Sequence, residues 1–444
     1  MTTASSRRQQ QAAPRLLQAV MDALRQPDLR NKLLFTLALL IVFRFLAHVP
    51  TPGVDRAALD RILNDSPIFG FFDLFSGGSF KRLSIASMGV YPYITASIAV
   101  QLMTPIIPAF RAMAEEGEQG RQRINQITHW LTVPLAILQA FGQLVLLERS
   151  GVIVNVGFGP GELLPTAVMV LSMTAATMFL VWIGELITEH GIGNGLSIII
   201  FGGIVAGMPA LIQKTFLNLN NFSGLMLFLI VALGIIFLIV VFTEATRRIP
   251  VEYGRTLFRG GRMYRQGGST FIPLRVNSAG MIPLIFAISI VILPGVFASY
   301  IADQTGWVGS VAGVVADLFS STGYFYWTLF FFLTVGFAFF YTLVIFTQQK
   351  LAENLQKNGG FIPGLRPGKP TDDYLTRVIL RITWGGALFL GLVAITPFFI
   401  EKITGVTGLL LSSTSVLIVV GVVLDTMRQI EAQLLMRDYE GFLK

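Results

Sequence analysis

Residues that could carry out chemistry are scarce in this chain of 444 residues. It contains no cysteine, which excludes disulfides, cysteine nucleophiles and zinc sites built from thiolates. Its histidines, His48, His129 and His190, lie far apart and no two share helical spacing, so the sequence does not predict a metal site. No nucleophile–base constellation is visible either. We therefore expect a protein that is not an enzyme and binds no cofactor.

Two glycine-rich segments lack the features of nucleotide-binding loops. The segment 364–370 has neither the spacing nor the Ser/Thr of a phosphate-binding loop. The segment 191–195 lies between two apolar runs and lacks the preceding strand that a dinucleotide site requires. Any energy for directed movement must therefore come from a partner or a gradient.

The composition is that of an integral membrane protein. The chain is 53% hydrophobic and only 13% charged, against roughly 25% charged residues in an average soluble domain. Its mean hydropathy is +0.67. So few polar residues cannot build a water-facing surface for this much apolar material, and lipid must cover much of it.

Ten apolar runs are long enough to cross a bilayer. They lie at about residues 33–49, 88–107, 127–147, 164–187, 196–212, 222–242, 276–300, 324–346, 382–400 and 409–424. The polar stretch before the first run lacks the apolar core and cleavage site of a signal peptide, so we predict a retained anchor behind a cytosolic tail. The predicted fold class is an all-α integral membrane protein with ten transmembrane helices.

The basic residues gather on one side of these spans. With an inside N-terminus, inside segments hold 25 of the 33 Lys and Arg residues and outside segments hold seven. The remaining one, Arg44, lies within the first span, where we expect it to snorkel or to pair inside the protein. The positive-inside rule then predicts a multi-pass protein with both termini in the cytoplasm. The net charge of +8 is accordingly a topology signal first.

Two inside segments hold 13 of these 25 basic residues. In the first, residues 244–275, Arg255 and Arg262 flank the paired glycines 260–261. Paired glycines accept positive φ, so we predict that they form the tip of a hairpin.

The second basic segment, residues 348–381, contains a Pro- and Gly-rich stretch that holds Arg366 on a stiff loop. A helix N-cap is predicted at Thr371, with acidic residues in the first turn. Both basic segments are open to a plain interpretation as topology anchors. Their length of about thirty residues instead favours a docking surface for an acidic cytosolic partner.

The predicted spans hold almost no charges. A transporter coupled to protons or ions usually binds the ion through carboxylates, histidines or paired charges near the midplane. Here Arg44 lies inside the first span and Glu185 lies near an end of the fourth. A secondary transporter for a small solute is thus a disfavoured alternative, and a membrane-embedded enzyme is third.

Eight short segments lie in order along the chain: Ile41-Val-Phe-Arg44, Pro50-Thr-Pro-Gly53, Phe75-Ser-Gly-Gly78, Gly89-Val-Tyr-Pro-Tyr-Ile-Thr-Ala-Ser97, Gly191-Ile-Gly-Asn-Gly-Leu-Ser-Ile-Ile-Ile200, Val276-Asn-Ser-Ala-Gly-Met-Ile-Pro283, Phe361-Ile-Pro-Gly-Leu-Arg-Pro-Gly368 and Thr414-Ser-Val-Leu-Ile-Val-Val420. Together they resemble the SecY family, the channel subunit of the bacterial Sec translocon. One such match is weak, whereas eight in order are highly specific.

This resemblance implies two pseudo-symmetric halves of five helices around an hourglass pore. The implied division of the chain is a cytosolic tail (1–31), a first half (32–213) with a plug segment at about 69–82, a second half (214–427) with the cytosolic loops 244–275 and 348–381, and a cytosolic C-terminal tail (428–444). The glutamine- and arginine-rich run of the N-terminal tail matches nothing in the family.

In the family, a ring of aliphatic side chains closes the pore. Its matching positions here are Val90, Ile94, Leu196, Ile200, Ile285 and Ile418. Val90 and Ile94 are four residues apart, so a helix places them on one face. A dry aliphatic ring resists ions by dewetting and makes no directional demand on a passing polypeptide. Without the resemblance, lipid contact or core packing explains each of these residues equally well.

The family's plug corresponds to a segment too short and too interrupted to cross a membrane alone. Its matching residues are Phe71, Phe72, Leu74, Phe75, Gly77 and Gly78. A short half-helix followed by glycines is tolerated inside a water-filled funnel. The alternative is an amphipathic loop outside the membrane.

Two polar residues mark the family's lateral gate, through which apolar segments reach lipid. Gln101 in the second span and Asn277 at the start of the seventh lie at similar depth on the cytosolic side. A polar cluster there would hold the gate shut until an apolar helix replaces it. Separate helix–helix hydrogen bonds are an equally good interpretation.

The resemblance implies a channel that passes unfolded preproteins across the bacterial inner membrane and releases apolar segments into lipid. The implied partners are SecE and SecG, the SecA ATPase, the ribosome, preprotein signal sequences and membrane lipid, and a dimer is also compatible. SecA and ribosomes dock on the two basic loops, so Arg255, Arg262 and Arg366 are the predicted docking residues. Ribosomal RNA explains the basic charge, because phosphate contacts need no sequence code.

Overall fold

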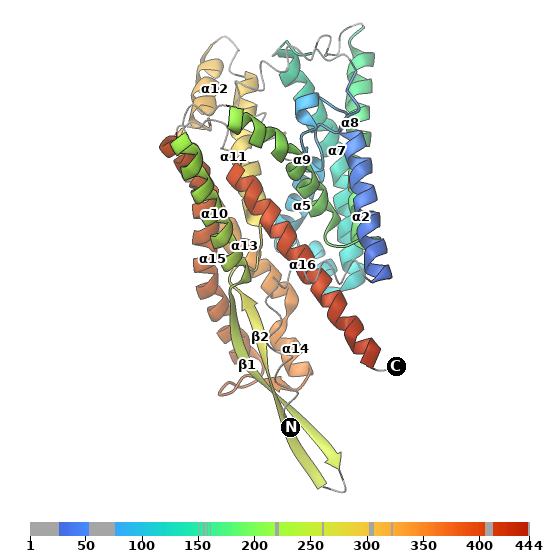
Figure 1. Ribbon diagram of the computed structural model, residues 1–444, viewed down its shortest axis with the longest axis vertical. Helices are drawn as coiled ribbons and strands as arrows, with labels where there is room; N and C mark the ends of the chain where they lie inside the picture. The colour runs from blue at the N-terminus through green and yellow to red at the C-terminus, as the bar shows by residue number, and fades with distance from the viewer. Residues whose placement is uncertain are drawn as a thin grey trace. The chain divides into compact units, whose positions relative to one another are not determined.

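The structure is a computed structural model (Figure 1) that describes residues 26–52, 76–149, 151–153, 156–157, 159, 161–217, 222–259, 262–301, 306–320, 323–404 and 412–442. The chain divides into two compact units. Unit 1 takes its residues from 1–97, 128–218 and 418–444, and unit 2 takes its residues from 98–127 and 219–417.

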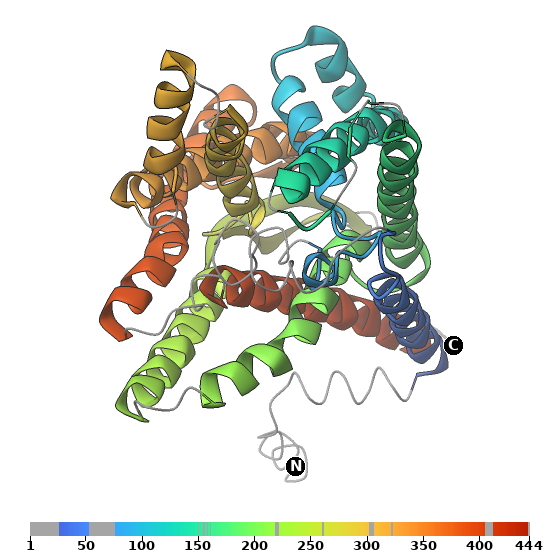
Figure 2. The same cartoon turned by 90° about the horizontal axis from the view of Figure 1, so that it is seen from above.

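Helices dominate the described part of the chain. In chain order the helices are α2 (Pro27–Leu46), η2 (Phe80–Arg82), α5 (Tyr91–Met103), α6 (Pro108–Glu115), α7 (Glu118–Arg149), α8 (Leu163–His190), α9 (Gly195–Leu217), α10 (Phe222–Glu244), α11 (Ile282–Ile301), α12 (Trp307–Leu318), α13 (Tyr324–Gln349), α14 (Leu351–Lys357), α15 (Lys369–Thr404) and α16 (Ser412–Phe442). In unit 1, α2 packs beside α8 and α9, as Figure 2 shows from above. In unit 2, α13 packs against α11 and α15.

Several of these helices suit a bilayer. Leu163–His190, Tyr324–Lys357 and Lys369–Thr396 are long and apolar enough to cross a membrane, and α5 and α6 together make a bent fourth candidate among the described residues. Shorter apolar helices lie at Gly195–Pro209, Leu233–Glu244, Ile282–Ile292 and Trp307–Leu318. The count of ten spans is consistent with this pattern and stays a prediction.

The second predicted span, residues 88–107, is interrupted. Helix α5 ends at Met103, and the chain then turns by 97° into α6. Pro105 and Pro108 explain the break, because a proline disfavours helical backbone in the residue before it. Ile107 is indeed extended, with φ −93° and ψ 119°.

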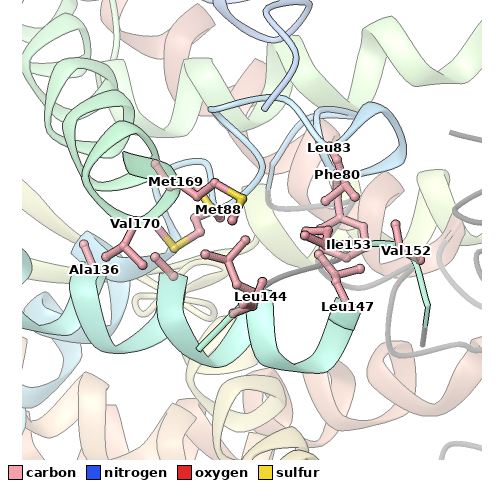
Figure 3. Packing of buried hydrophobic residues seen from close by; sticks show 13 residues of the cluster. Phe80, Leu83, Met88, Ala136, Leu144, Leu147, Val152, Ile153, Met169 and Val170 are labelled. Atoms are coloured by element: carbon pink, nitrogen blue, oxygen red, sulfur yellow. The ribbon is translucent and has the colours of Figure 1, made fainter. Parts of the chain in front are cut away.

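The packed interior of unit 1 is a cluster of apolar side chains from α7, α8 and the segments beside them (Figure 3). Phe80, Leu144 and Leu147 are fully or almost fully buried. Phe80 comes from η2, so the short segment that precedes α5 is held by the same core as two long helices. This places the end of the predicted plug segment on a rigid support.

A long hairpin extends from unit 2. Strand β1 (Thr246–Arg259) pairs antiparallel with β2 (Arg262–Arg275) over their whole length, from Thr246↔Arg275 to Arg259↔Arg262. This register confirms the predicted hairpin, although the glycines at its tip lie outside the described residues. Strand β3 (Gly360–Phe361) joins the other edge of β1 and completes a sheet of order β2-β1-β3.

The Pro- and Gly-rich stretch between β3 and α15 forms a tight loop. Gly364 and Gly368 have positive φ, at 83° and 101°, which only glycine adopts without strain. The predicted N-cap at Thr371 is wrong, because α15 already begins at Lys369. The Thr371 hydroxyl donates instead to the carbonyl of Arg366 at 2.8 Å, while Asp372 does lie in the first turn. The hydroxyl thus braces the loop that carries Arg366.

Candidate functional site

The first pair of predicted ring residues lies where α5 begins. The amide of Ile94 donates to the carbonyl of Val90 at 3.1 Å, so the two residues are one helical turn apart. Val90 is fully buried and Ile94 is half-buried. Their shared face agrees with the spacing argument.

The second pair lies in the first turns of α9. Leu196 packs against α8, where a Cβ added at Gly184 would lie 2.8 Å from the Leu196 Cδ2 atom. Ile200 follows one turn later and is buried. Ile418 on α16 is also fully buried in unit 1, while Ile285 is buried on α11 in unit 2. The assembly of these residues into one ring stays a prediction.

Only the end of the predicted plug lies within the described residues. Phe71, Phe72, Leu74 and Phe75 fall outside them, whereas Gly77 and Gly78 are described and have positive φ of 66° and 80°. Residues 76–80 are called the plug end below. The plug end continues directly into η2 and hence into the core of unit 1.

Arg44 on α2 pairs inside the protein. Its Nη1 atom donates to the carbonyl of Gly77 at 3.0 Å. The sequence predicted snorkelling or internal pairing, and internal pairing is what the structure has. The partner could not be inferred from the sequence, because the two residues meet only through the packing of α2 on the plug end.

The end of α2 is tied to the segment after the plug end by further bonds. His48 Nδ1 donates to the carbonyl of Arg44 at 2.7 Å, which leaves its Nε2 to accept from Arg82. The amide of Thr51 donates to the carbonyl of Leu83 at 2.8 Å. These contacts fix η2 and its neighbours against α2.

The predicted gate residues both belong to unit 2 and are both half-buried. Gln101 lies two residues before the end of α5 at Met103. Asn277 does not begin the seventh helix as predicted, because α11 starts at Ile282 and Asn277 lies in the turn before it. Their role as a polar gate cluster stays a prediction.

A contact between a histidine and a carboxylate was missed by sequence reasoning. His129 Nε2 on α7 lies 2.7 Å from Glu185 Oε1 on α8, and the ring of Tyr93 on α5 packs edge-on against His129 at 5.4 Å. No spacing rule could have found it, because the residues come from three helices. Among the described residues no group of three His, Asp or Glu side chains is arranged to hold a metal ion.

The two basic loops share one apolar core in unit 2, and we call this assembly the docking platform. It comprises β1, β2, β3, α14 and the first turns of α15. Val251 of β1 and Leu375 of α15 are fully buried in its centre. Arg366 is exposed on the loop above it, and Arg255 and Arg262 lie in the paired strands near the hairpin tip. The platform is a folded body and not a slack linker.

Comparison with known proteins gives the family. A family model described as SecY matches residues 84–427. The chain is 42% identical to the protein translocase subunit SecY of Streptomyces scabiei, over 97% of this chain and 100% of that protein. It is 40% identical to the corresponding subunit of Thermotoga maritima, over 96% of this chain and 98% of that one.

The chain belongs to the SecY family.

Solved structures agree with this assignment at the level of the fold. The chain matches a structure described as a protein conducting channel with a TM-score of 0.61 and 15% identity, covering 90% of this chain and 91% of that one. It matches Sec61 from a canine ribosome–channel complex with a TM-score of 0.60 and 16% identity, with the same coverage. The resemblance inferred from eight motifs and the all-α membrane fold class are thereby confirmed.

A substitution in the apolar core of the docking platform tests whether this core holds the two basic loops rigid. Replacing the fully buried Leu375 with Ala removes apolar contacts and leaves a cavity, which typically costs about 2–5 kcal/mol. We expect Leu375→Ala to raise the protease sensitivity of residues 244–275 and 348–381 in the purified protein. Glu353→Ala, at an exposed position of α14, should leave the cleavage rate unchanged. Equal protection in the two variants would show that the loops do not depend on this core.

Proposed function

We propose that this chain is the protein-conducting channel subunit of a bacterial translocase. The observation that carries the proposal is the match to SecY translocase subunits along nearly the whole chain. A channel subunit moves a polypeptide and catalyses no reaction, in keeping with the names of these relatives. Unfolded preproteins pass across the membrane, and apolar segments leave sideways into the bilayer.

The topology belongs to the same proposal. Both termini lie in the cytoplasm of a multi-pass protein of the inner membrane, since 25 of the 33 basic residues fall on one side of the predicted spans. The halves 32–213 and 214–427 surround the pore. The tails 1–31 and 428–444 then lie on the cytosolic side together with the docking platform.

Each predicted site has a role in this scheme. The aliphatic ring closes the pore to ions, the plug segment seals it further, and Gln101 and Asn277 border the lateral gate. Burial supports the ring in part, since Val90, Ile200 and Ile418 are apolar and buried.

The partners follow from the docking platform and from the relatives. SecE and SecG complete the complex, and the SecA ATPase or a ribosome supplies the driving force through Arg255, Arg262 and Arg366. A solved relative of the same fold, Sec61, was determined in a ribosome–channel complex. An exposed arginine on a rigid support suits an acidic or phosphate-rich surface, because its planar guanidinium can donate two parallel hydrogen bonds to one carboxylate or phosphate.

Reconstitution tests the proposal directly. We expect liposomes containing the purified chain with SecE and SecG to take up a preprotein, in a protease-protected form, only when SecA and ATP are present. Omitting ATP provides the control for passive leakage. A complex that assembles yet never protects a preprotein would favour the alternative of a small-solute transporter.

A further inference from the structure

Arg44 carries its charge at a position where a charge is energetically unfavourable. It lies in α2 among apolar residues of the first predicted span, and it is only partly exposed. Ionisable groups inside such segments face the protein interior and mark functional contacts more often than structural ones. Its neighbours in sequence, Phe43 and Phe45, are apolar, and Phe43 is buried. In these apolar surroundings the guanidinium needs a hydrogen-bond acceptor within the protein to offset its lost hydration.

The acceptor is backbone that only glycine allows. Arg44 Nη1 donates to the carbonyl of Gly77 at 3.0 Å, and a Cβ added at Gly78 would lie 3.7 Å from the same nitrogen. Both glycines have positive φ, a backbone conformation that other residues rarely adopt, and both lie beside the guanidinium. A charged donor makes this hydrogen bond stronger than a neutral one.

The opposite side of the plug end rests on α9. A Cβ added at Gly203 would lie 2.2 Å from the Cα of Gly77, so the two backbones touch with no side chain between them. A Cβ on Gly77 itself would lie 2.9 Å from the ring of Phe43. The plug end is thus clamped between α2 and α9, by a charge on one side and by backbone contact on the other.

The next residues along the chain are already fixed. The amide of Phe80 donates to Ser76 Oγ at 2.9 Å, and the Phe80 ring is fully buried in the core. Phe80 is therefore held in place by both its backbone and its side chain. The amide of Ile85 donates to the carbonyl of Val49 at 3.0 Å. These bonds lie within the plug end and the segment after it, whereas the contacts at Gly77 attach the plug end to α2 and α9.

From these contacts we propose that Arg44 and Gly203 are positioning residues that clamp the plug end and bias the channel toward its closed state. This inference rests on the proposed function as a protein-conducting channel. The clamp holds the plug end while the channel is idle, and a signal sequence must supply the free energy that releases it. Weakening the clamp raises the population of the open state without any change in the pore ring.

Two unrelated substitutions test the clamp. Arg44→Gln removes the charged donor, and Gly203→Ala pushes the plug end away without changing any charge. A hydrogen bond to a charged group typically stabilises by enough to shift a two-state equilibrium roughly ten-fold. We expect each variant, reconstituted with SecE and SecG, to raise the ion conductance of the idle channel and the uptake of a preprotein with a defective signal sequence by about that factor. Arg44→Lys, which keeps a charged donor, should lie between wild type and Arg44→Gln.

Matched controls lie on the same two helices. Arg30→Gln removes an exposed charge from α2, and Gly207→Ala adds a methyl group to α9 where nothing lies within 4 Å. Both should conduct and translocate as wild type does. If Arg44→Gln does not assemble with SecE, the clamp is tested by Gly203→Ala alone, because this variant leaves the Arg44 charge in place.

The outcomes separate the two proposals. Leak and relaxed signal requirement in Arg44→Gln and Gly203→Ala, with normal controls, support the clamp. Wild-type behaviour of Gly203→Ala in a channel that translocates normally overturns it. A wild-type channel that never translocates overturns the proposed function instead.

Discussion

Reversing the charge of Arg366 is expected to abolish export while leaving the folded complex intact. Arg366 is exposed on the loop between β3 and α15, and its own carbonyl accepts the hydrogen bond from Thr371. The loop is held through the Arg366 backbone and the core below, so substituting the exposed side chain leaves this support in place. Arg366→Glu places a carboxylate where we propose that an acidic or phosphate-rich partner docks, and like charges at an interface cost several kcal/mol.

The measurement is the rate of preprotein uptake driven by SecA in reconstituted liposomes, together with the melting temperature of the complex. We expect the rate to fall by at least about a hundred-fold and the melting temperature to stay unchanged. Lys357→Glu is the matched control, since it reverses an exposed charge on α14 of the same platform. Normal export by Arg366→Glu would count heavily against the docking role of this loop.

A covalent link across the lateral gate is expected to block both insertion and export. Gln101 lies near the end of α5 and Asn277 in the turn before α11, and the proposed gate opens by separating α5 from α11. The chain has no cysteine, so Gln101→Cys and Asn277→Cys introduce the only thiols. Joining them with bismaleimides of increasing length should lower insertion by at least roughly ten-fold, because the link removes the open population.

A cleavable linker supplies the internal control for this experiment. Cutting it should restore activity, and each single cysteine treated with the same reagent should remain active. A linked channel that inserts apolar segments at the normal rate would refute the assignment of the gate to these two residues.

The prolines after α5 show where sequence reasoning was incomplete. The run 88–107 is apolar throughout, and apolarity alone predicted one span. Pro105 and Pro108 interrupt the helix, because backbone sterics act regardless of hydrophobicity. This break was available in the sequence, as was the start of α15 before Thr371, and both errors concern the boundary of an element.

The contacts that position the site were not available in the sequence. His129 and Glu185, Arg44 and Gly77, and Gly77 and Gly203 pair residues from distant parts of the chain. Helical spacing relates residues three or four apart and says nothing of which faces of two helices meet. Such contacts exist only once the helices have packed.

The sequence by itself determined the class of protein, the hairpin and the stiff loop of Arg366, and it predicts the side on which the basic residues gather. These follow from composition and from local backbone preferences, which need no partner segment. Only the tertiary structure decided what Arg44 binds, what supports the docking platform and how closely the plug end approaches α9. Those properties depend on side chains and backbones brought together by the burial of apolar surface across the whole unit.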